Sequence, residues 1–419
     1  MRKIGVVTAT RAEFGLLKPL IQKLSNEDIF EVSVLVTGAH LSEEFGYTYK
    51  EIEEAGIPIA AKIECLTGDD NGAGITQVMA KAMTGFADYF AKNHLDLLIV
   101  LGDRYETMAV CIAAMNAGVP IAHIHGGETT EGAIDEAIRH SITKMSLLHF
   151  TATDIYRKRV IQLGEDPKRV FNVGALGADN IKHMEFIPKE ELIKEVLEIA
   201  AKDGNGTSAG IYTDSKDENE RSSNVLKACD KYAVVTYHPV TLDENSGVEK
   251  LDELLKALDK YKDMNFIITK ANADAGGRQI NARLDEYAVA RDNVVVVTSL
   301  GAKRYLSAVK EAAAVIGNSS SGIIEAPCLH VPTVNIGDRQ KGRLMPESVI
   351  SCEPDCASIV KAIDTALSDD FRQKVKAMDN PFGDGETSAK IVEVLKKYFE
   401  SNRTLDIKKQ FYDIDIMNI

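Results

Sequence analysis

Residues 95–132 read LDLLIVLGDRYETMAVCIAAMNAGVPIAHIHGGETTEG and contain one complete strand–helix–strand unit. Leu95–Leu101 and Pro120–Ile124 are almost continuously apolar, and the longer segment Tyr105–Ala117 between them has the pattern of a helix. Apolar strands separated by helices are typical of parallel sheets that are covered on both faces. This stretch therefore predicts an α/β fold.

The same alternation continues on both sides of this unit. The first part of the chain has further expected strands at Ile4–Thr8, Glu31–Thr37, Leu148–Thr151 and Val170–Val173. The pattern then restarts, with expected strands at Tyr232–Thr236, Asn265–Thr269, Asn293–Thr298, Ala314–Ile316 and Pro332–Ile336. Since one domain holds roughly 100–200 residues, a chain of this length fits two. We expect two doubly wound α/β domains, residues 1–175 and 176–384.

Two further segments have distinct compositions. Residues 203–223 are polar and rich in Gly, Ser, Asp and Asn. Such a segment has too few apolar residues to offset the entropy of ordering it, so we expect an exposed insertion that is neutral or serves as a contact surface. The amphipathic stretch from Ser388 to about Phe399 predicts a last helix, followed by the aromatic pair Phe411 and Tyr412.

Charge and apolar content exclude several classes of protein. The 419 residues include 49 Lys+Arg and 63 Asp+Glu, a net charge of −14, whereas a nucleic-acid binder needs a basic stripe. No apolar run approaches the roughly 18 residues that a membrane span needs. The N-terminus lacks the pattern of a signal peptide, and the six cysteines are scattered as in a reducing compartment. We expect a cytoplasmic protein that binds neither nucleic acid nor membrane.

Polar residues follow the predicted strands one after another. Open parallel sheets bind ligands in the crevice beyond the carboxyl ends of their strands. Loops are polar in any protein, but nine such segments in register favour a ligand site. They begin at Thr8, Thr37, Gly102, His123, Thr236, Lys270, Ser299, Gly317 and Gly337.

The second domain has the candidate phosphate site. The loop Gly317–Gly322, with Ser319, Ser320 and Ser321, leads from a strand into a helix, where N–H groups and hydroxyls bind phosphate well. It is not a Walker loop, and no GxGxxG follows any strand, which disfavours ATP and NAD.

Charged residues and one histidine extend this candidate site. Glu325 has a position suited to a ribose diol, or is a solvated helix residue. Arg339, Lys341 and Arg343 form either a diphosphate cradle or an ordinary solvated turn. His238, ahead of Pro239 at the mouth of the second sheet, favours a ligand contact over a core histidine.

The first domain has the candidate acid–base groups. Asp103 ends one strand, Glu128 lies in the following glycine loop, and Asp135 and Glu136 open the next helix. Carboxyl groups that converge raise the pKa of at least one of them, which suits proton transfer near neutral pH. The alternative is that Asp135 and Glu136 only complement the helix dipole.

Histidines in the same region leave further alternatives open. His123 and His125 alternate on a strand and are expected to share a face, as two metal ligands would. No third ligand lies at short spacing, so we expect no metal. Arg139 and His140 either line the site or end the helix.

These motifs together resemble the hydrolysing UDP-N-acetylglucosamine 2-epimerases, over nearly the whole chain. The resemblance implies a glycosyltransferase-B-like fold of two Rossmann-like domains, with the active site between them and a C-terminal helix, about 385–419, packing back on the first. It also implies a UDP-sugar substrate and no metal or redox cofactor. The segments that carry it are Thr10–Gly15, Gly102–Glu106, His123–Glu128, Ile138–Lys144, Gly317–Gly322 and Ile336–Arg343.

The resemblance implies roles for particular residues. Asp103 and Asp135 match carboxylates used for acid–base work, and many relatives have Glu where this chain has His125, so that role passes to His125 or to Glu128. Which carboxylate removes the proton stays open. The substrate-binding residues that we expect are Arg11, His238, Ser299, Gly301, Ser319, Ser320, Ser321, Gly322, Glu325, Arg339 and Arg343.

The implied reaction is anti elimination of UDP across C1–C2, then addition of water with inversion at C2. It converts UDP-N-acetylglucosamine and water into UDP and N-acetylmannosamine, for sialic acid synthesis. Close relatives act instead on UDP-2,4-diacetamido-2,4,6-trideoxyglucose, on the way to legionaminic acid. Non-hydrolysing epimerases, glycosyltransferases and a non-catalytic nucleotide-sugar binder fit the motifs less well. We expect a homodimer or homotetramer.

Overall fold

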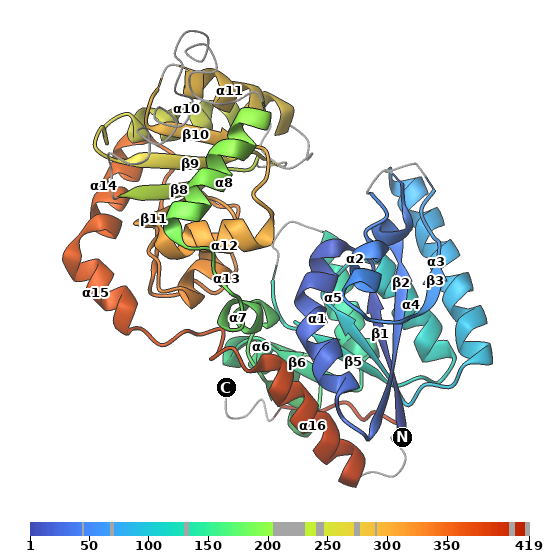
Figure 1. Cartoon of the computed structure of the whole chain (residues 1–419). Coiled ribbons are helices and arrows are strands. Elements are labelled where there is room, and N and C mark those ends of the chain that lie inside the picture. Colours follow the sequence, from blue (N-terminus) through green and yellow to red (C-terminus); the bar gives the residue numbers. More distant parts are fainter. Residues whose placement is uncertain are drawn as a thin grey trace. The chain divides into compact units, whose positions relative to one another are not determined.

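The computed structural model describes residues 1–43, 46–67, 71–129, 134–203, 231–239, 247–271, 277–289, 291–401 and 407–414. The predicted insertion 203–223 lies outside these residues except for Asp203. The chain forms two compact units: unit 1 comprises Met1–Lys182 and Pro381–Ile419, and unit 2 comprises His183–Asn380 (Figure 1).

Unit 1 is built on a parallel sheet of seven strands in the order β3-β2-β1-β4-β5-β6-β7. Its strands are β1 Arg2–Thr8, β2 Phe30–Thr37, β3 Ile59–Ile63, β4 Leu97–Leu101, β5 Ile121–Ile124, β6 Leu148–Thr151 and β7 Val170–Asn172. Its helices are α1 Arg11–Ser25, α2 Tyr49–Glu54, α3 Gly72–Lys92, α4 Tyr105–Asn116, α5 Ile134–Met145, α6 Asp154–Gln162, α7 Leu176–Lys182 and α16 Thr387–Ser401, with short 3-10 turns at Gly38–Leu41 and Pro167–Arg169.

Unit 2 is built on a parallel sheet of six strands in the order β10-β9-β8-β11-β12-β13. Its strands are β8 Tyr232–Thr236, β9 Asn265–Thr269, β10 Val294–Val297, β11 Ala314–Gly317, β12 Thr333–Ile336 and β13 Val349–Cys352. Its helices are α8 Lys189–Lys202, α10 Gly247–Leu258, α11 Gly277–Val289, α12 Gly301–Glu311, α13 Ser321–Cys328, α14 Cys356–Leu367 and α15 Asp369–Ala377.

Apolar cores cover both faces of each sheet, as the near-continuous hydrophobic strands predict. All five residues of β4 are buried, and so are all five of β8. In unit 2, for example, Val235 packs into the core on one face of the sheet and Val234 into the core on the other. The prediction of two doubly wound parallel sheets is confirmed.

The sequence pattern missed two edge strands, β3 and β13, whose residues are only partly buried or exposed. The edge strands β7 and β10 were predicted, since each contains apolar residues in a short run. An edge strand needs no continuous apolar run, because one side of it faces no partner strand. Nothing in the periodicity of Ile59–Ile63 or Val349–Cys352 therefore marked them as strands.

The first helix begins where its sequence provides a complete N-terminal cap. The Thr10 side chain accepts a hydrogen bond from the Glu13 N–H, and the Glu13 carboxylate accepts one from the Thr10 N–H. This reciprocal pair satisfies two helix N–H groups that otherwise lack partners. It fixes the start of α1, and so the position of Arg11, directly after β1.

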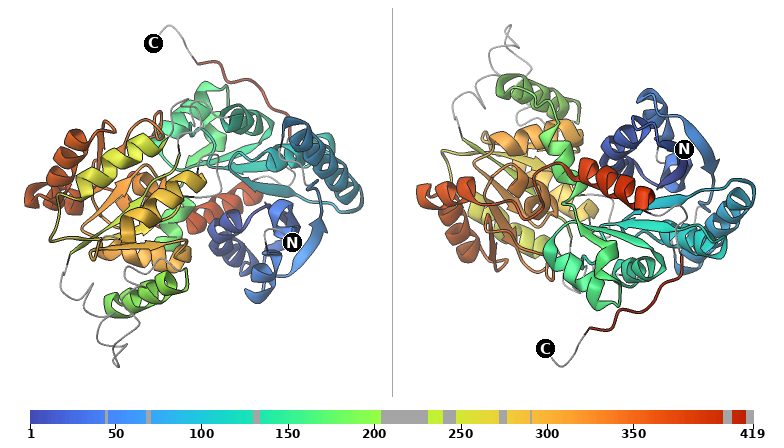
Figure 2. Two further views of the ribbon diagram at one scale, coloured as in Figure 1. Left: turned by 90° about the horizontal axis from the view of Figure 1, so that it is seen from above. Right: turned by 90° about the horizontal axis from the view of Figure 1, so that it is seen from below.

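The C-terminal helix α16 belongs to unit 1, far from the rest of that unit in sequence (Figure 2). Ile391, Leu395 and Phe399 are buried in the core that also contains residues of α1 and α7, and the Phe399 ring meets Phe30 edge-on at 6.1 Å. Lys396 pairs with Glu27 at 2.6 Å. Apolar burial together with this ion pair holds α16 on unit 1.

Candidate active site

The carboxyl groups of unit 1 gather at the carboxyl ends of its central strands. The strand order reverses between β1 and β4, and such a switch point is where doubly wound sheets form their ligand crevice. Asp103 follows β4 by two residues, and Glu128 follows β5 by four. Asp135 is in the first turn of α5. The topology thus brings three separate segments to one edge of the sheet.

Asp103 is the centre of this cluster. Its carboxylate is paired with the guanidinium of Arg139, whose side chain is only 6% exposed. Burial raises the pKa of Asp103 above its ordinary value of 3.8, and the charges of Asp135 and Glu128 raise it further, while Arg139 opposes them. The predicted convergence of Asp103, Glu128 and Asp135 is therefore present, with a raised pKa on one member.

His125 and Glu128 form a second pair in the loop after β5. His125 Nδ1 lies 3.4 Å from Glu128 Oε1, and the Leu176 N–H lies 3.4 Å from His125 Nε2. Both side chains are less than one-fifth exposed. The loop turns sharply, since His125 has φ 67° and Gly127 φ 80°. A Cβ on Gly127 would lie 2.3 Å from the Tyr156 carbonyl oxygen, so only glycine fits there.

His123 has a structural position and does not share a face with His125 by strand alternation. It is fully buried in β5, with Nε2 2.8 Å from the Gly102 carbonyl oxygen and Nδ1 3.2 Å from Thr143 Oγ1. Burial lowers its pKa to about 3. The expectation of a shared face was wrong because β5 ends at Ile124 and His125 has left-handed backbone geometry.

Helix α5 supplies the groups around Asp103. Glu136 Oε2 lies 3.6 Å from Arg139 Nη1, and Glu136 Oε1 lies 3.1 Å from His140 Nε2. Asp135 and Glu136 are also the first-turn acids that the helix dipole favours, so both interpretations of them hold at once. Arg139 joins the candidate site as the partner of Asp103.

A second buried carboxyl cluster beside β1 was not predicted. Glu106 is fully buried and is bridged by Arg104, with Nη2–Oε1 at 2.8 Å. The charge of Glu106 acts on Glu13, and burial raises the Glu13 pKa from 4.5 to about 7 against hydrogen bonds from Ala9 and Thr10. The sequence feature that could have predicted this cluster is an arginine followed by a glutamate after each of two neighbouring strands, at Arg11–Glu13 and at Arg104–Glu106. Arg11 itself is exposed at the first position of α1.

In unit 2 the corresponding switch point lies between β8 and β11. Asn318 is 1% exposed and holds both polar groups of the His238 backbone: its Oδ1 accepts from His238 N at 2.7 Å, and its Nδ2 donates to His238 O at 2.8 Å. The side-chain amide therefore ties the loop after β8 to the loop after β11. This places His238 beside the Gly317–Gly322 loop, as predicted from their positions at strand ends.

Gly317 allows this close approach. It has φ 139°, and a Cβ there would lie 2.0 Å from the Thr236 carbonyl oxygen. No other residue type fits without moving β8 or β11.

The loop after β12 reaches the same backbone. Arg339 Nη1 and Gln340 Nε2 both donate to the Asn318 carbonyl oxygen, at 3.1 and 2.8 Å. Arg343, a few residues on, lies near enough to Glu325 for its charge to oppose the rise in the pKa of that carboxyl. Arg339 and Arg343 thus belong to one cluster with the glycine–serine loop.

Helix α13 begins at this cluster with buried hydroxyl groups. Ser320 makes no side-chain cap, and Ser319 Oγ accepts from the Ser321 N–H at 3.4 Å. Ser321 Oγ and Tyr305 Oη are two of the buried polar atoms in the described part of the chain that have no hydrogen bond of normal geometry, and the Ser321 hydroxyl lies close to both Tyr305 and Glu325. A buried hydroxyl without a partner costs free energy unless a ligand or water satisfies it. These groups indicate a polar ligand at the start of α13.

Glu325, one turn into α13, is half-buried. Burial raises its pKa, and Arg343 opposes that rise. Gly322 packs against β12, since a Cβ there would lie 2.8 Å from Thr333 Cγ2.

Ser299 and Gly301 are less enclosed than the other predicted residues. Both are exposed, and the Gly301 N–H donates to Ser299 Oγ at 3.2 Å. They form an exposed turn ahead of α12.

Sequence reasoning missed Asn318, Gln340 and Tyr305 as parts of the site. Asn318 and Gln340 lie within motifs that were recognised. Their side chains form hydrogen bonds to backbone groups of other loops, and no residue pattern reveals such contacts. Tyr305 is inside a helix, and nothing in the spacing distinguishes it from a core aromatic.

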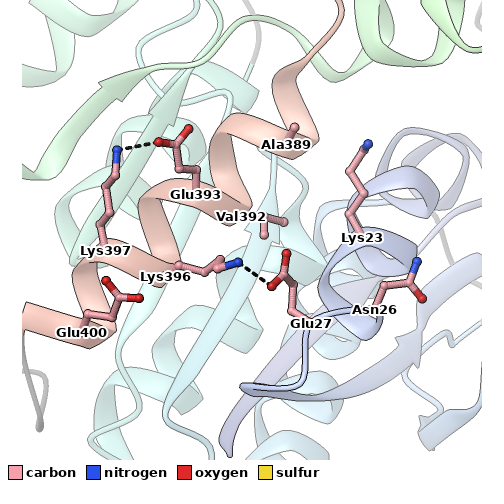
Figure 3. Close-up of a pocket in the computed structure, with 9 residues that line it drawn as sticks. All are labelled: Lys23, Asn26, Glu27, Ala389, Val392, Glu393, Lys396, Lys397 and Glu400. Atoms are coloured by element: carbon pink, nitrogen blue, oxygen red, sulfur yellow. Dashed lines mark hydrogen bonds and ion pairs between the residues drawn. The ribbon is translucent and has the colours of Figure 1, made fainter.

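One surface hollow lies away from these residues. It is lined along α1 and α16 by Lys23, Asn26, Glu27, Ala389, Val392, Glu393, Lys396, Lys397 and Glu400 (Figure 3). Charges of both signs line it, and two internal ion pairs occupy several of them.

The fold and the two strand-end clusters define the class of protein. Two doubly wound parallel sheets with polar residues at their switch points make this a glycosyltransferase-B-like α/β protein. Staphylococcus aureus MnaA in its complex with UDP has a TM-score of 0.72 at 18% identity, over 98% of this chain and 100% of that one. The Neisseria meningitidis UDP-GlcNAc 2-epimerase bound to UDP-GlcNAc has a TM-score of 0.67 at 17% identity, over 94% and 100%.

Sequence comparison then identifies the family. The family model described as UDP-N-acetylglucosamine 2-epimerase matches residues 22–396, and the chain belongs to this family. A hydrolysing GDP/UDP-N,N'-diacetylbacillosamine 2-epimerase of Campylobacter jejuni is 39% identical over 373 residues, 89% of each chain. The polysialic acid biosynthesis protein P7 of Escherichia coli is 36% identical over 417 residues, 99% of this chain and 98% of that protein.

The described part of the chain has neither a membrane-spanning helix nor a cluster of metal-ligating side chains. None of the helices among the described residues is both long and apolar enough to cross a bilayer. Within those same residues, no group of three or more His, Cys, Asp or Glu side chains is arranged to hold a metal ion.

Proposed function

We propose that the chain is a hydrolysing 2-epimerase of a UDP-linked 2-acetamido sugar. The observation that carries the proposal is the cluster around Asp103, where three carboxylates and a buried arginine meet and one carboxyl has a raised pKa. A protein that only bound the nucleotide would need the groups at α13 but would have no use for this cluster.

The proposed reaction has two steps. A carboxylate removes the proton from C2 while the C1–O bond to UDP breaks, which leaves a 2-acetamidoglucal and UDP. Water then adds across the double bond: its hydroxyl goes to C1, and a proton returns to C2 on the opposite face. The products are UDP and the sugar inverted at C2, and the protein supplies only proton transfer and charge stabilisation.

The acid–base work belongs to unit 1 in this proposal. A C2–H bond is hardly acidic, so proton removal must accompany departure of the diphosphate. Asp103 and Asp135 are the first candidates for the base, and His125 with Glu128 for handling water. Arg139 keeps Asp103 oriented and sets how readily it ionises.

The nucleotide belongs to unit 2. The buried hydroxyls at the start of α13 are proposed to bind phosphate oxygens, and Glu325 to accept from the ribose diol. Arg339 and Arg343 are proposed to stabilise the charge on the departing diphosphate. Further proposed contacts come from Arg11, His238, Ser299, Gly301, Ser319, Ser320, Ser321 and Gly322.

Relatives support two substrates. The Campylobacter enzyme, at 39% identity, and a Legionella pneumophila enzyme, at 30%, are both named for diacetylbacillosamine, the 2,4-diacetamido-2,4,6-trideoxy sugar. The Escherichia coli P7 protein, at 36%, is named for polysialic acid, and the Neisseria meningitidis relative, at 28%, for UDP-N-acetylglucosamine. We place the diacetamido sugar first, because the relative at 39% identity is named for it, and UDP-N-acetylglucosamine second.

Steady-state rates of UDP release with the two nucleotide sugars test this order. We expect turnover of both or one, with a higher kcat/KM for the diacetamido sugar, and a free 2-epimerised sugar as the product. A higher kcat/KM for UDP-N-acetylglucosamine would reverse the order and leave the reaction class intact. A product still linked to UDP would contradict hydrolysis.

The predicted homodimer or homotetramer and the cytoplasmic location stay predictions. Sedimentation velocity of the purified protein tests the first, and cell fractionation tests the second.

A further inference from the structure

The C-terminal tail, residues 407–414, lies against the far end of the helix that carries the proposed acid–base groups. Figure 2 shows it in dark red as an extended segment beside the teal and green part of unit 1. The Tyr412 N–H donates to the Gly164 carbonyl oxygen at 2.9 Å. The Phe411 ring covers Gly164, where a Cβ would lie 2.3 Å from it. The tail is therefore seated on unit 1 by specific contacts.

Lys409 is the polar anchor of the tail. Its Nζ donates to the carbonyl oxygens of Lys144 and Ser146, at 2.9 and 2.6 Å, where α5 ends. The last carbonyls of a helix have no partner within it, and a cation there also complements the helix dipole. A residue more than 260 positions away in sequence thus caps α5.

The same ammonium group completes a buried ion cluster. Lys409 Nζ lies 2.6 Å from Glu165, whose side chain is 1% exposed and which also meets Lys144 at 2.6 Å and His149 at 3.0 Å. Burial opposes ionisation of Glu165, but these three partners outweigh it and lower its pKa to about 2. Removing one partner of a buried carboxylate is costly, so the cluster depends on the tail.

Two routes lead from this cluster to Asp103. The first is α5 itself, which ends at the Lys409 cap and carries Arg139, the partner of Asp103, in its middle turn. The second is the sheet: His149 is the strand neighbour of His123, which contacts the Gly102 carbonyl oxygen and the Thr143 hydroxyl. That hydroxyl donates to the Arg139 carbonyl oxygen at 3.0 Å.

We propose that Lys409 is a positioning residue for the reaction, which caps α5 and thereby holds Arg139 against Asp103. Its effect on catalysis rests on the proposed function, whereas its effect on α5 does not. Neither activity nor substrate contact is assigned to the tail itself.

The test compares Lys409→Met with Lys409→Arg and with the control Lys397→Met. Lys397 is 71% exposed and pairs with Glu393 within its own helix, so its loss removes the same charge without touching α5. We expect Lys409→Met to lower kcat about tenfold or more, as misplacement of catalytic groups does, with UDP affinity unchanged. Lys409→Arg keeps the charge and several donors and should restore most of kcat.

The pH profile separates positioning from loss of folded protein. If Arg139 moves away from Asp103, burial and the charges of Asp135 and Glu128 act on that carboxyl unopposed by the guanidinium, and its pKa rises. The acidic limb of kcat/KM then shifts to higher pH in Lys409→Met. The proposal would be overturned if kcat of Lys409→Met fell only in proportion to the loss of folded protein and the acidic limb of its kcat/KM profile did not shift.

Amide hydrogen exchange gives a readout that needs no substrate. We expect Lys409→Met to speed exchange along α5, including its first turns near Asp135, and Lys397→Met to leave α5 unchanged. Faster exchange confined to the tail would overturn the proposal. If the wild-type protein turns over no UDP-sugar, the proposed function fails while this measurement still judges the role of Lys409.

Discussion

Asp103 stands between one cation and two further carboxylates. Its pairing with Arg139 favours the ionised form, whereas burial and the charges of Asp135 and Glu128 favour the protonated form. A carboxyl balanced in this way can both accept and return a proton, which an exposed aspartate at neutral pH does poorly. This balance makes Asp103 the residue on which the proposed chemistry depends most.

Replacing that carboxylate should separate catalysis from binding. We expect Asp103→Asn to lower kcat at least about 100-fold, the usual contribution of a general acid or base. UDP affinity by calorimetry should stay within about twofold, since the proposed nucleotide contacts lie mostly in unit 2. Asp154→Asn is the control, because Asp154 is 58% exposed in a surface pair with Lys158. Loss of UDP binding in Asp103→Asn would refute the acid–base assignment.

Glu13 gives a pH-dependent stability that can be measured without substrate. Its pKa rises from 4.5 to about 7 on folding, mainly through burial. The folded state therefore binds this proton more tightly, so its contribution is complete below pH 4.5 and is lost as pH rises through about 7.

The variant Glu13→Gln should remove that dependence, because the amide oxygen still accepts the hydrogen bonds from Ala9 and Thr10. Between pH 5 and 8, wild-type stability should fall by about 1 to 2 kcal/mol more than that of the variant, a value reduced for partial exposure. Urea unfolding at both pH values measures this difference. Parallel pH profiles for the two proteins would contradict it.

Among individual residues, the candidate reactive groups could be predicted from the sequence, whereas the residues that position the loops of the site could not. Asp103, Glu128 and Asp135 stood out because carboxylates at strand ends meet at one edge of a sheet. Asn318 did not, because its function is to bond the backbone of His238, a contact between loops 80 residues apart. Such contacts depend on tertiary distances that no local pattern encodes.

Among the elements, the join of β8 and β11 requires a glycine. Gly317→Ala would place a Cβ 2.0 Å from the Thr236 carbonyl oxygen at a backbone φ of 139°. We expect a loss of at least about 2 kcal/mol of stability together with loss of UDP binding, because strain and a backbone clash act together. Thermal unfolding and calorimetry measure the two effects.

Gly72→Ala is the matched control, since no atom lies within 4 Å of the Cβ that it would add. Its stability should change by less than about 0.5 kcal/mol. A Gly317→Ala protein as stable as this control, with UDP binding intact, would contradict the described geometry.

Strands with an apolar run were predictable, and strands without one were not. The interior strands β4 and β8 are continuous apolar runs, so their positions followed from composition alone. β3 and β13 lie at sheet edges, where half-exposed residues leave no such run. Helix α16 was recognised by its amphipathic spacing, although spacing alone does not say which surface it covers.

At the scale of the whole molecule, the two units divide the proposed work. Unit 1 has the carboxylates at its switch point, and unit 2 has the hydroxyls and arginines at its own. The net charge of −14 says little about the ligand, because the cations that matter are concentrated at strand ends. Local charge, rather than net charge, decides which ligand such a site accepts.

The central claim is that a C2–H bond is broken and remade while UDP departs. Turnover of the nucleotide sugar in deuterium oxide, followed by NMR, tests it directly. We expect release of UDP and a free sugar inverted at C2 that carries deuterium at that carbon. A free sugar that keeps its original hydrogen at C2 and its original configuration would contradict the proposed reaction, because simple hydrolysis at C1 would then explain the release of UDP.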